Sequence, residues 1–191
     1  AIGYSAATQV TAGVSNLNSV AIGYFSGVGT SSTGTNTSIG AAAGNTITSG
    51  TNLTLIGYNA QPLAATSINQ VTLGNSNVKT LRCAATSITA ISDSRDKTEI
   101  QDLVLGIEFI NSVKPVQFKW DKREWYKNNV SDGSQKQDTF QAGFIAQELD
   151  SAQISANAEW MDLVLKDNPD HLEATPMKLF PAVVKSCQDL Y

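Results

Sequence analysis

The sequence predicts a mixed fold in two parts: a repetitive all-β segment over residues 1–91 and a small α+β domain over residues 92–191 that closes with a helix. Three observations support this division. Of the 30 charged residues, only Lys79 and Arg82 lie in the first part. Eleven of the 14 glycines also lie there, and a short apolar–glycine step recurs through it. Segments that differ so strongly are not expected to share one core, so we place the boundary after Ile91.

The repeat sets the predicted structure of the first part. Its glycines recur 17 residues apart, after a first interval of 20, at Gly3, Gly23, Gly40, Gly57 and Gly74. The step suits brief strands joined by tight turns, where Gly and Asn tolerate a left-handed backbone. A unit of this length cannot bury its own apolar face, so it must stack on neighbours or on other chains. Three chains around a shared axis would also remove exposed strand edges.

The second part alternates strand-like and helix-like segments. An apolar periodic stretch follows over residues 103–113, and residues 113–121 alternate as a strand does. Residues 141–149 read as a strand that runs into a helix, with a polar surface loop before them. The apolar residues between Trp160 and Leu165 suggest a further buried strand.

The closing helix is predicted to start at Thr175 and Pro176. After it, apolar residues follow at spacings of three and four, which is the pattern of a coiled-coil seam: Met177, Phe180, Val184, Cys187 and Tyr191. The seam covers two heptads, and Pro181 is expected to remove one internal hydrogen bond. The alternative is an amphipathic helix that packs on its own domain.

Several classes of function are disfavoured by composition. The net charge of −4 gives no support for binding nucleic acid or an anionic membrane, and no apolar run approaches the ~20 residues that span a bilayer. Cys83 and Cys187 are too far apart to suggest a disulfide framework or a zinc site, so we expect two reduced, mostly buried thiols. We expect His171 at the surface, and no metal or cofactor. The repeat is already running at Ala1, so the chain is expected to be part of a longer protein.

Residues 92–100 carry the motif Ser-Asp-x-Arg-x-Lys-x-x-Ile. By itself this segment reads as a helix start, with a Ser or Asp N-cap and acidic residues in the first turn. It is followed in order by Lys-Pro-Val-x-Phe-x-Trp from Lys114, by Gly-Phe-Ile-Ala-Gln-Glu up to Glu148, and by the closing helix. This ordered set resembles the endosialidase-type intramolecular chaperone peptidases of phage tail fibres and tail spikes, over residues 92–191. Residues 18–23 resemble the head repeats of trimeric bacterial adhesins and the shaft repeats of phage fibres.

The resemblance implies an obligate homotrimer, in which an autoproteolytic chaperone domain drives folding of a β-helix or β-roll shaft and then cuts itself off. Ser92 would be the nucleophile and Lys97 the general base of a Ser–Lys dyad, in a single-turnover autocatalytic serine peptidase that cleaves the Ile91–Ser92 bond. Four further residues match the family motifs as supporting positions: Asp93, Arg95, Gln147 and Glu148. We assign Asp93 and Arg95 to positioning or to pairing between chains.

The spacing of the dyad constrains its geometry. Residues five apart are about 140° apart around an α-helix and lie on opposite faces of a strand. Neither brings Ser92 to Lys97 within hydrogen-bond reach, so the dyad needs either a turn within residues 92–97 or a lysine from a neighbouring chain. A lysine also acts as a base only when desolvation or a nearby cation lowers its pKa.

The resemblance further implies a location in the virion tail fibre, with the chaperone domain acting in the host cytoplasm before its release. The mature fibre would meet a bacterial surface receptor. One alternative is a non-cleaving structural or receptor-binding fibre tip. Another is a trimeric bacterial adhesin, which would end in a membrane anchor. A glycan-cleaving enzyme is disfavoured because residues 1–91 contain no carboxylate side chain.

Overall fold

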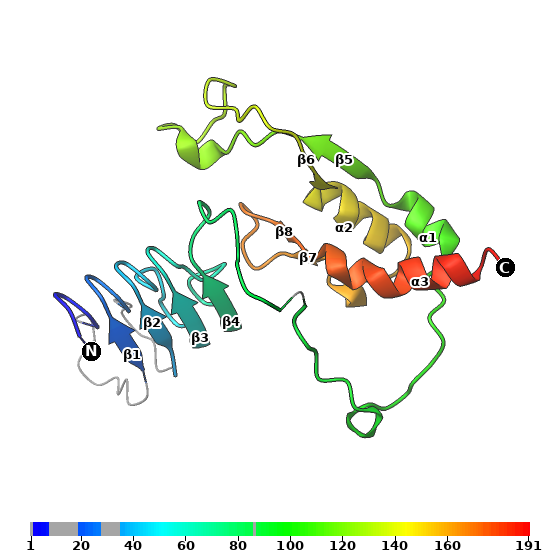
Figure 1. The fold of residues 1–191 in the computed structure, drawn as a ribbon, viewed down its shortest axis with the longest axis horizontal. Coiled ribbons are helices and arrows are strands. Elements are labelled where there is room, and N and C mark those ends of the chain that lie inside the picture. Colours follow the sequence, from blue (N-terminus) through cyan, green and yellow to red (C-terminus); the bar gives the residue numbers. More distant parts are fainter. Residues whose placement is uncertain (1, 8–18, 28–34, 86) are drawn as a thin grey trace. The chain divides into compact units, whose positions relative to one another are not determined.

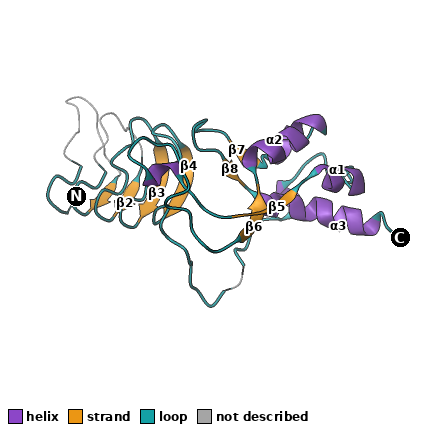
Figure 2. Ribbon diagram, turned by 90° about the horizontal axis from the view of Figure 1, so that it is seen from above, coloured by secondary structure: helices purple, strands orange, loops and turns teal. Residues whose placement is uncertain are grey.

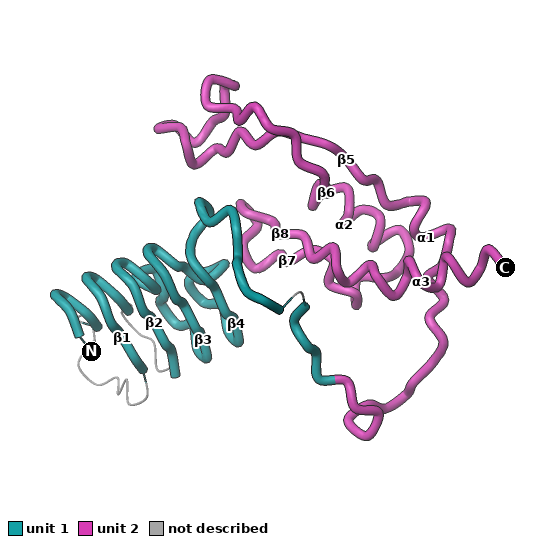
Figure 3. Tube along the Cα trace, in the orientation of Figure 1, with its two compact units in different colours: residues 1–91 teal, residues 92–191 magenta. Residues whose placement is uncertain are grey.

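The computed structural model describes residues 2–7, 19–27, 35–85 and 87–191. The chain divides into two compact units, Ala1–Ile91 and Ser92–Tyr191, shown in two colours in Figure 3. Strands β1 to β4 belong to the first unit, whereas helices α1, α2 and α3 all belong to the second (Figure 2). The predicted mixed fold, with several sheets and a closing helix, is confirmed at this level.

The first unit contains a parallel sheet in the order β1-β2-β3-β4 (Figure 1). Its strands are β1 (Val20–Ile22), β2 (Thr37–Ile39), β3 (Thr51–Ile56) and β4 (Ile68–Leu73). Successive strands pair residues 17 apart, as in Ile22 with Ile39 and Ile39 with Ile56. The 17-residue spacing of the glycines in the sequence is therefore the same as the spacing between residues that pair on neighbouring strands. Ala1 and Asn18, which stand in the repeated phrases, lie outside the described residues.

Alternation along the strands separates the two faces of this sheet. One face points into a small core of Ala43, Ile47, Leu53, Leu55 and Ala60. On the other face, Ile22 and Ile56 are 37% and 41% exposed. The glycines stack from rung to rung, because a Cβ added to Gly23 would lie 2.6 Å from the carbonyl oxygen of Gly40. Gly23 has φ of +129°, which side-chain-bearing residues rarely adopt, so the repeat needs glycine there.

The second unit is built from three helices and two small antiparallel sheets. Strands β5 (Pro115–Phe118) and β6 (Gln141–Phe144) pair with each other, as do β7 (Val164–Leu165) and β8 (Glu173–Ala174). The helices are α1 (Ile107–Ser112), α2 (Ala146–Ser155) and α3 (Phe180–Gln188). Short 3-10 turns complete it: η1 (Ser94–Asp96), η2 (Arg123–Trp125), η3 (Glu159–Met161) and η4 (Pro176–Leu179).

One hydrophobic core holds this unit together. Phe109 of α1, Leu149 of α2 and Ala182 of α3 meet in it, together with Leu163 from the segment that leads into β7. Gln153 is the buried polar side chain of α2, and its Oε1 accepts a hydrogen bond from the Leu163 amide at 3.0 Å. The side chain of Gln153 thus holds the residue before β7 against α2.

Some local predictions for the second part were wrong. Within the apolar periodic stretch over residues 103–113, only Ile107–Ser112 is helical. Trp160 is 66% exposed on η3, because the buried strand there is only the two residues of β7. Both thiols are exposed, since Cys83 lies in a loop and Cys187 on the open face of α3. Pro181 lies in the first turn of α3, where no intrahelical hydrogen bond is lost.

Candidate functional site

The predicted cleavage bond lies in an exposed segment. Every described residue from 76 to 102 is exposed, and the side chain of Ile91 is 96% exposed. The described residues of this segment carry no strand or α-helix and only one short 3-10 turn, η1, which follows Ser92 and its neighbour Asp93. A peptide bond in such a segment is accessible to attack and can be cut without unfolding either unit.

The turn at η1 reverses the chain after Ser92. Asp93 is its N-cap, and its Oδ1 accepts a hydrogen bond from the Arg95 amide at 2.9 Å. The Lys97 amide then donates to the carbonyl oxygen of Ser94 at 3.2 Å, and Lys97 itself returns to an extended backbone. Because this single turn is flanked by extended residues at Asp93 and Lys97, the long side chain of Lys97 can reach back to Ser92.

Lys97 and Ser92 are in direct contact within one chain. The Nζ of Lys97 lies 2.6 Å from the Oγ of Ser92 and 3.2 Å from the Ser92 carbonyl oxygen. Of the two routes that the spacing left open, the structure contains the turn. Both side chains are exposed, so the amine is surrounded by water in the single chain. The contact has the distance that proton transfer between a hydroxyl and an amine requires.

Asp93 and Arg95 pair with each other across the same turn. The Arg95 Nη2 lies 2.7 Å from Asp93 Oδ2, and the Arg95 Nε lies 3.1 Å from Asp93 Oδ1. This side-chain hydrogen bond, together with the backbone amide of Arg95, lowers the pKa of Asp93 below its ordinary value. The same partner raises the pKa of Arg95. The pair ties the N-cap of the turn to its middle residue.

The other two motif residues lie apart from the turn, on the first turn of α2. Gln147 and Glu148 are both exposed there. Glu148 Oε1 accepts from the Nζ of Lys114 at 3.1 Å, which joins α2 to the residue before β5. Sequence reasoning did not identify Lys114 as a partner, although it begins the Lys-Pro-Val motif. This ion pair links two of the family motifs but does not contact Ser92 or Lys97.

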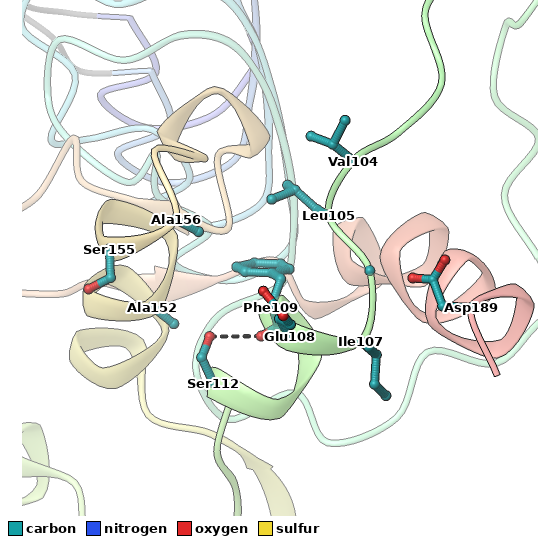
Figure 4. Close-up of a pocket in the computed structure, with 11 residues that line it drawn as sticks. Val104, Leu105, Ile107, Glu108, Phe109, Ser112, Ala152, Ser155, Ala156 and Asp189 are labelled. Atoms are coloured by element: carbon teal, nitrogen blue, oxygen red, sulfur yellow. Dashed lines mark hydrogen bonds between the residues drawn. The ribbon is translucent and has the colours of Figure 1, made fainter.

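A pocket of about 490 Å³ lies elsewhere in the second unit, between α1, α2 and the end of α3 (Figure 4). Phe109 forms its apolar centre, and the carboxylates of Glu108 and Asp189 lie at its edge (Figure 4). The carboxylate of Asp189 is held by Lys185, which lowers the pKa of Asp189. Neither Ser92 nor Lys97 is among the residues that line this pocket.

Two other kinds of feature are absent from the described residues. They contain no group of three or more His, Cys, Asp or Glu side chains placed to hold a metal ion. Within the same ranges, no helix has both the length and the apolar character needed to cross a bilayer.

Comparison with known proteins gives one match. Residues 92–158 match the model of peptidase family S74, described as the chaperone of endosialidase. The match begins at Ser92 and includes the turn, β5, β6 and α2. It supports a chaperone role for these residues, and the family's designation suggests autocatalytic peptidase activity. No curated protein and no solved structure matches the chain.

Proposed function

We propose that residues 92–191 form an intramolecular chaperone that drives homotrimeric folding of the preceding β-repeat segment of a phage tail fibre or spike, and then cleaves the Ile91–Ser92 bond. The observation that carries the proposal is the 2.6 Å contact between Lys97 Nζ and Ser92 Oγ. It lies at the first residue of the family match, beside an exposed peptide bond.

Cleavage proceeds in two steps: transfer of the Ile91 acyl group to Ser92 Oγ, and then hydrolysis of the resulting ester. A neutral Lys97 amine takes the proton of the Ser92 hydroxyl, while Oγ attacks the carbonyl carbon of Ile91. The C–N bond then breaks, and the proton passes from Lys97 to the amino nitrogen of Ser92. The product is an ester between the Ile91 carbonyl and Ser92 Oγ. Water then attacks this ester, which leaves a carboxylate at Ile91 and restores the Ser92 hydroxyl.

Assembly of several chains would remove water from around Lys97, which this chemistry requires. In the single chain the side chain of Lys97 is exposed to solvent, whereas a lysine general base works in a site from which water is excluded. Burial disfavours the charged form of a lysine side chain. Copies of the chain that cover the turn would therefore activate the dyad, so that cleavage follows trimerisation.

Phe180, Val184 and Cys187 form a row of exposed side chains along α3, which we call the open row. This row provides a surface for that assembly. Phe180 and Val184 are 61% and 41% exposed, whereas Ala182 on the opposite side is fully buried against the unit. The helix therefore packs on its own domain through small residues, while Phe180 and Val184 of the predicted seam stay largely exposed. Three copies of α3 could bury these rows against one another.

The test is a denaturing gel of the freshly expressed full chain, followed by N-terminal sequencing of the smaller fragment. Two fragments, with the C-terminal one beginning at Ser92, are expected for the natural chain. Lys97→Ala should give one full-length band, and Ser94→Ala, in the same turn, should still be cut. A single band for the natural chain would instead favour the non-cleaving structural or receptor-binding fibre tip.

A further inference from the structure

The outward face of the β1–β4 sheet carries a straight column of large apolar side chains. Register pairing places them one above another, 17 residues apart along the sheet: Ile22, Ile39, Ile56 and Leu73. Ile2 pairs with Ile22 and extends the column by one position. We call these five residues the isoleucine column. Ile2, Ile56 and Leu73 are 68%, 41% and 51% exposed.

The isoleucine column is not part of the unit's own core. Neighbouring positions on the same strands point the other way and are buried, as Ala21, Ser38 and Leu55 are. A second outward row runs beside the column and is mixed in character, with Val20, Thr37, Thr54 and Val71 in register. An apolar strip of this kind on a protein surface usually marks an interaction site.

The charge of the unit restricts what can cover this strip. The first charged side chain of the whole sequence is Lys79, beyond the end of β4. Nucleic acid or anionic lipid would find no cation on the sheet to bind. A second copy of the same face would meet no like charge and would bury apolar against apolar surface.

The spacing of the column restricts the partner further. Parallel strands are about 4.8 Å apart, so equivalent side chains recur at that interval along a straight line. A partner that matches the column over its whole length must repeat at the same interval. The sheet of another copy has this repeat, and copies related by rotation about an axis along the column carry equal residues at equal heights.

We propose that the isoleucine column is the contact between copies of this chain in the first unit, with the copies parallel and in register. This inference rests on the proposed assembly of identical chains and names the surface that the assembly uses.

Cysteine cross-linking in the full chain tests the contact. Ile56→Cys and Thr46→Cys are placed separately in a Cys83→Ser, Cys187→Ser background and treated with a short bismaleimide. Thr46 is exposed on the segment between β2 and β3 and serves as the control. Linked chains are expected for Ile56→Cys and only single chains for Thr46→Cys. Ile22→Cys chains mixed with Ile56→Cys chains should link only to their own kind.

The outcomes separate this inference from the proposed function. If the natural chain has the mass of three chains and is cut, but Ile56→Cys does not link, the column is not the contact and the chaperone proposal stands. Linking of Thr46→Cys as strongly as Ile56→Cys also overturns the inference. A natural chain that is single in solution and uncut overturns both.

Discussion

The amine of Lys97 lies 2.6 Å from the hydroxyl oxygen of Ser92 in the same chain, although five residues separate them. The 3-10 turn at η1 makes this possible, and no neighbouring chain has to supply the lysine. The dyad that we propose is therefore complete in geometry before assembly, although both of its side chains are still exposed to solvent. Assembly would act by removing water from the turn rather than by completing the set of residues.

This distinction predicts the behaviour of mixed assemblies. Chains with Ser92→Ala co-expressed with chains carrying Lys97→Ala should give no cleavage, because no chain holds both groups. Mixing natural chains with either variant should leave the natural chains cut. The measurement is a denaturing gel of each co-expressed pair, with a different tag on each variant. A cut Lys97→Ala chain in the first mixture would show that the lysine comes from a neighbour.

The ion pair across the turn predicts a second effect. Asp93→Asn keeps a side chain that can cap the turn but removes the charge that holds Arg95, so the turn opens more often and cleavage slows severalfold without being lost. The expected change is in the rate at which the full-length band disappears. Lys122→Gln, which removes a charge away from the turn, is the control and should leave that rate unchanged.

The pKa of Asp93 gives the same turn a defined pH dependence. Arg95 lowers this pKa below the ordinary 3.8, so the carboxylate form stabilises the turn at neutral pH. That contribution is complete above the ordinary value and is lost as pH falls through the lowered pKa. In uncleavable Ser92→Ala, the amide signal of Arg95 should therefore keep its position from pH 7 to about pH 4 and move below it. Movement centred above the ordinary Asp pKa would contradict the pairing.

Gln153 predicts a larger effect on stability. Gln153→Leu leaves the buried amide of Leu163 without its acceptor and removes the hydrogen bond to Asp150, whose pKa is lowered by Lys166. A buried unpaired amide costs about 1–3 kcal/mol, so the free energy of unfolding should fall by that amount. Chemical denaturation of the second unit measures it. Gln147→Leu on the exposed side of α2 is the matched control, and surface changes of this kind stay within about 0.5 kcal/mol.

The sequence predicted regular features well and local exceptions poorly. The 17-residue interval of the glycines is the register of the sheet because each glycine stacks on the next. The contact of Ser92 with Lys97 could not be predicted from helix and strand geometry, because it depends on a turn capped by Asp93. The burial of Cys187 was wrong because residue type gives only an average, and this thiol lies on the open face of α3.

The stacking of the glycines predicts that the same substitution, Gly to Ala, destabilises the first unit much more at Gly23 than at Gly74. Gly23→Ala would place a Cβ 2.6 Å from the Gly40 carbonyl oxygen, at a φ of +129°, so we expect the unit to lose at least about 2 kcal/mol. In Gly74→Ala the new Cβ would meet the side chain of Val78, which can move, and the loss should be smaller. Thermal unfolding and protease resistance of the first unit measure both. Equal losses would mean that the backbone stack does not limit the repeat.

The open row of α3 predicts an effect on assembly, because its apolar side chains are expected to be buried when copies of the chain associate. Phe180→Asn combined with Val184→Asn should lower the mass from three chains towards one and slow cleavage, while the secondary structure of the unit is kept. Both side chains point away from the core that Ala182 enters, so folding of the single unit does not depend on them. Gln188→Ala is the control on the same helix and should change neither mass nor cleavage.

Cys187 lies in the same row and is exposed, so it reports directly on the contact. In a Cys83→Ser background, a short bismaleimide should join Cys187 of one copy to Cys187 of another, because equivalent seam positions face each other in parallel coiled coils. The double asparagine variant should lose this link together with its trimeric mass. Linking that persists in the variant, or a trimer that forms without any link, would place the contact between copies on another surface of the second unit.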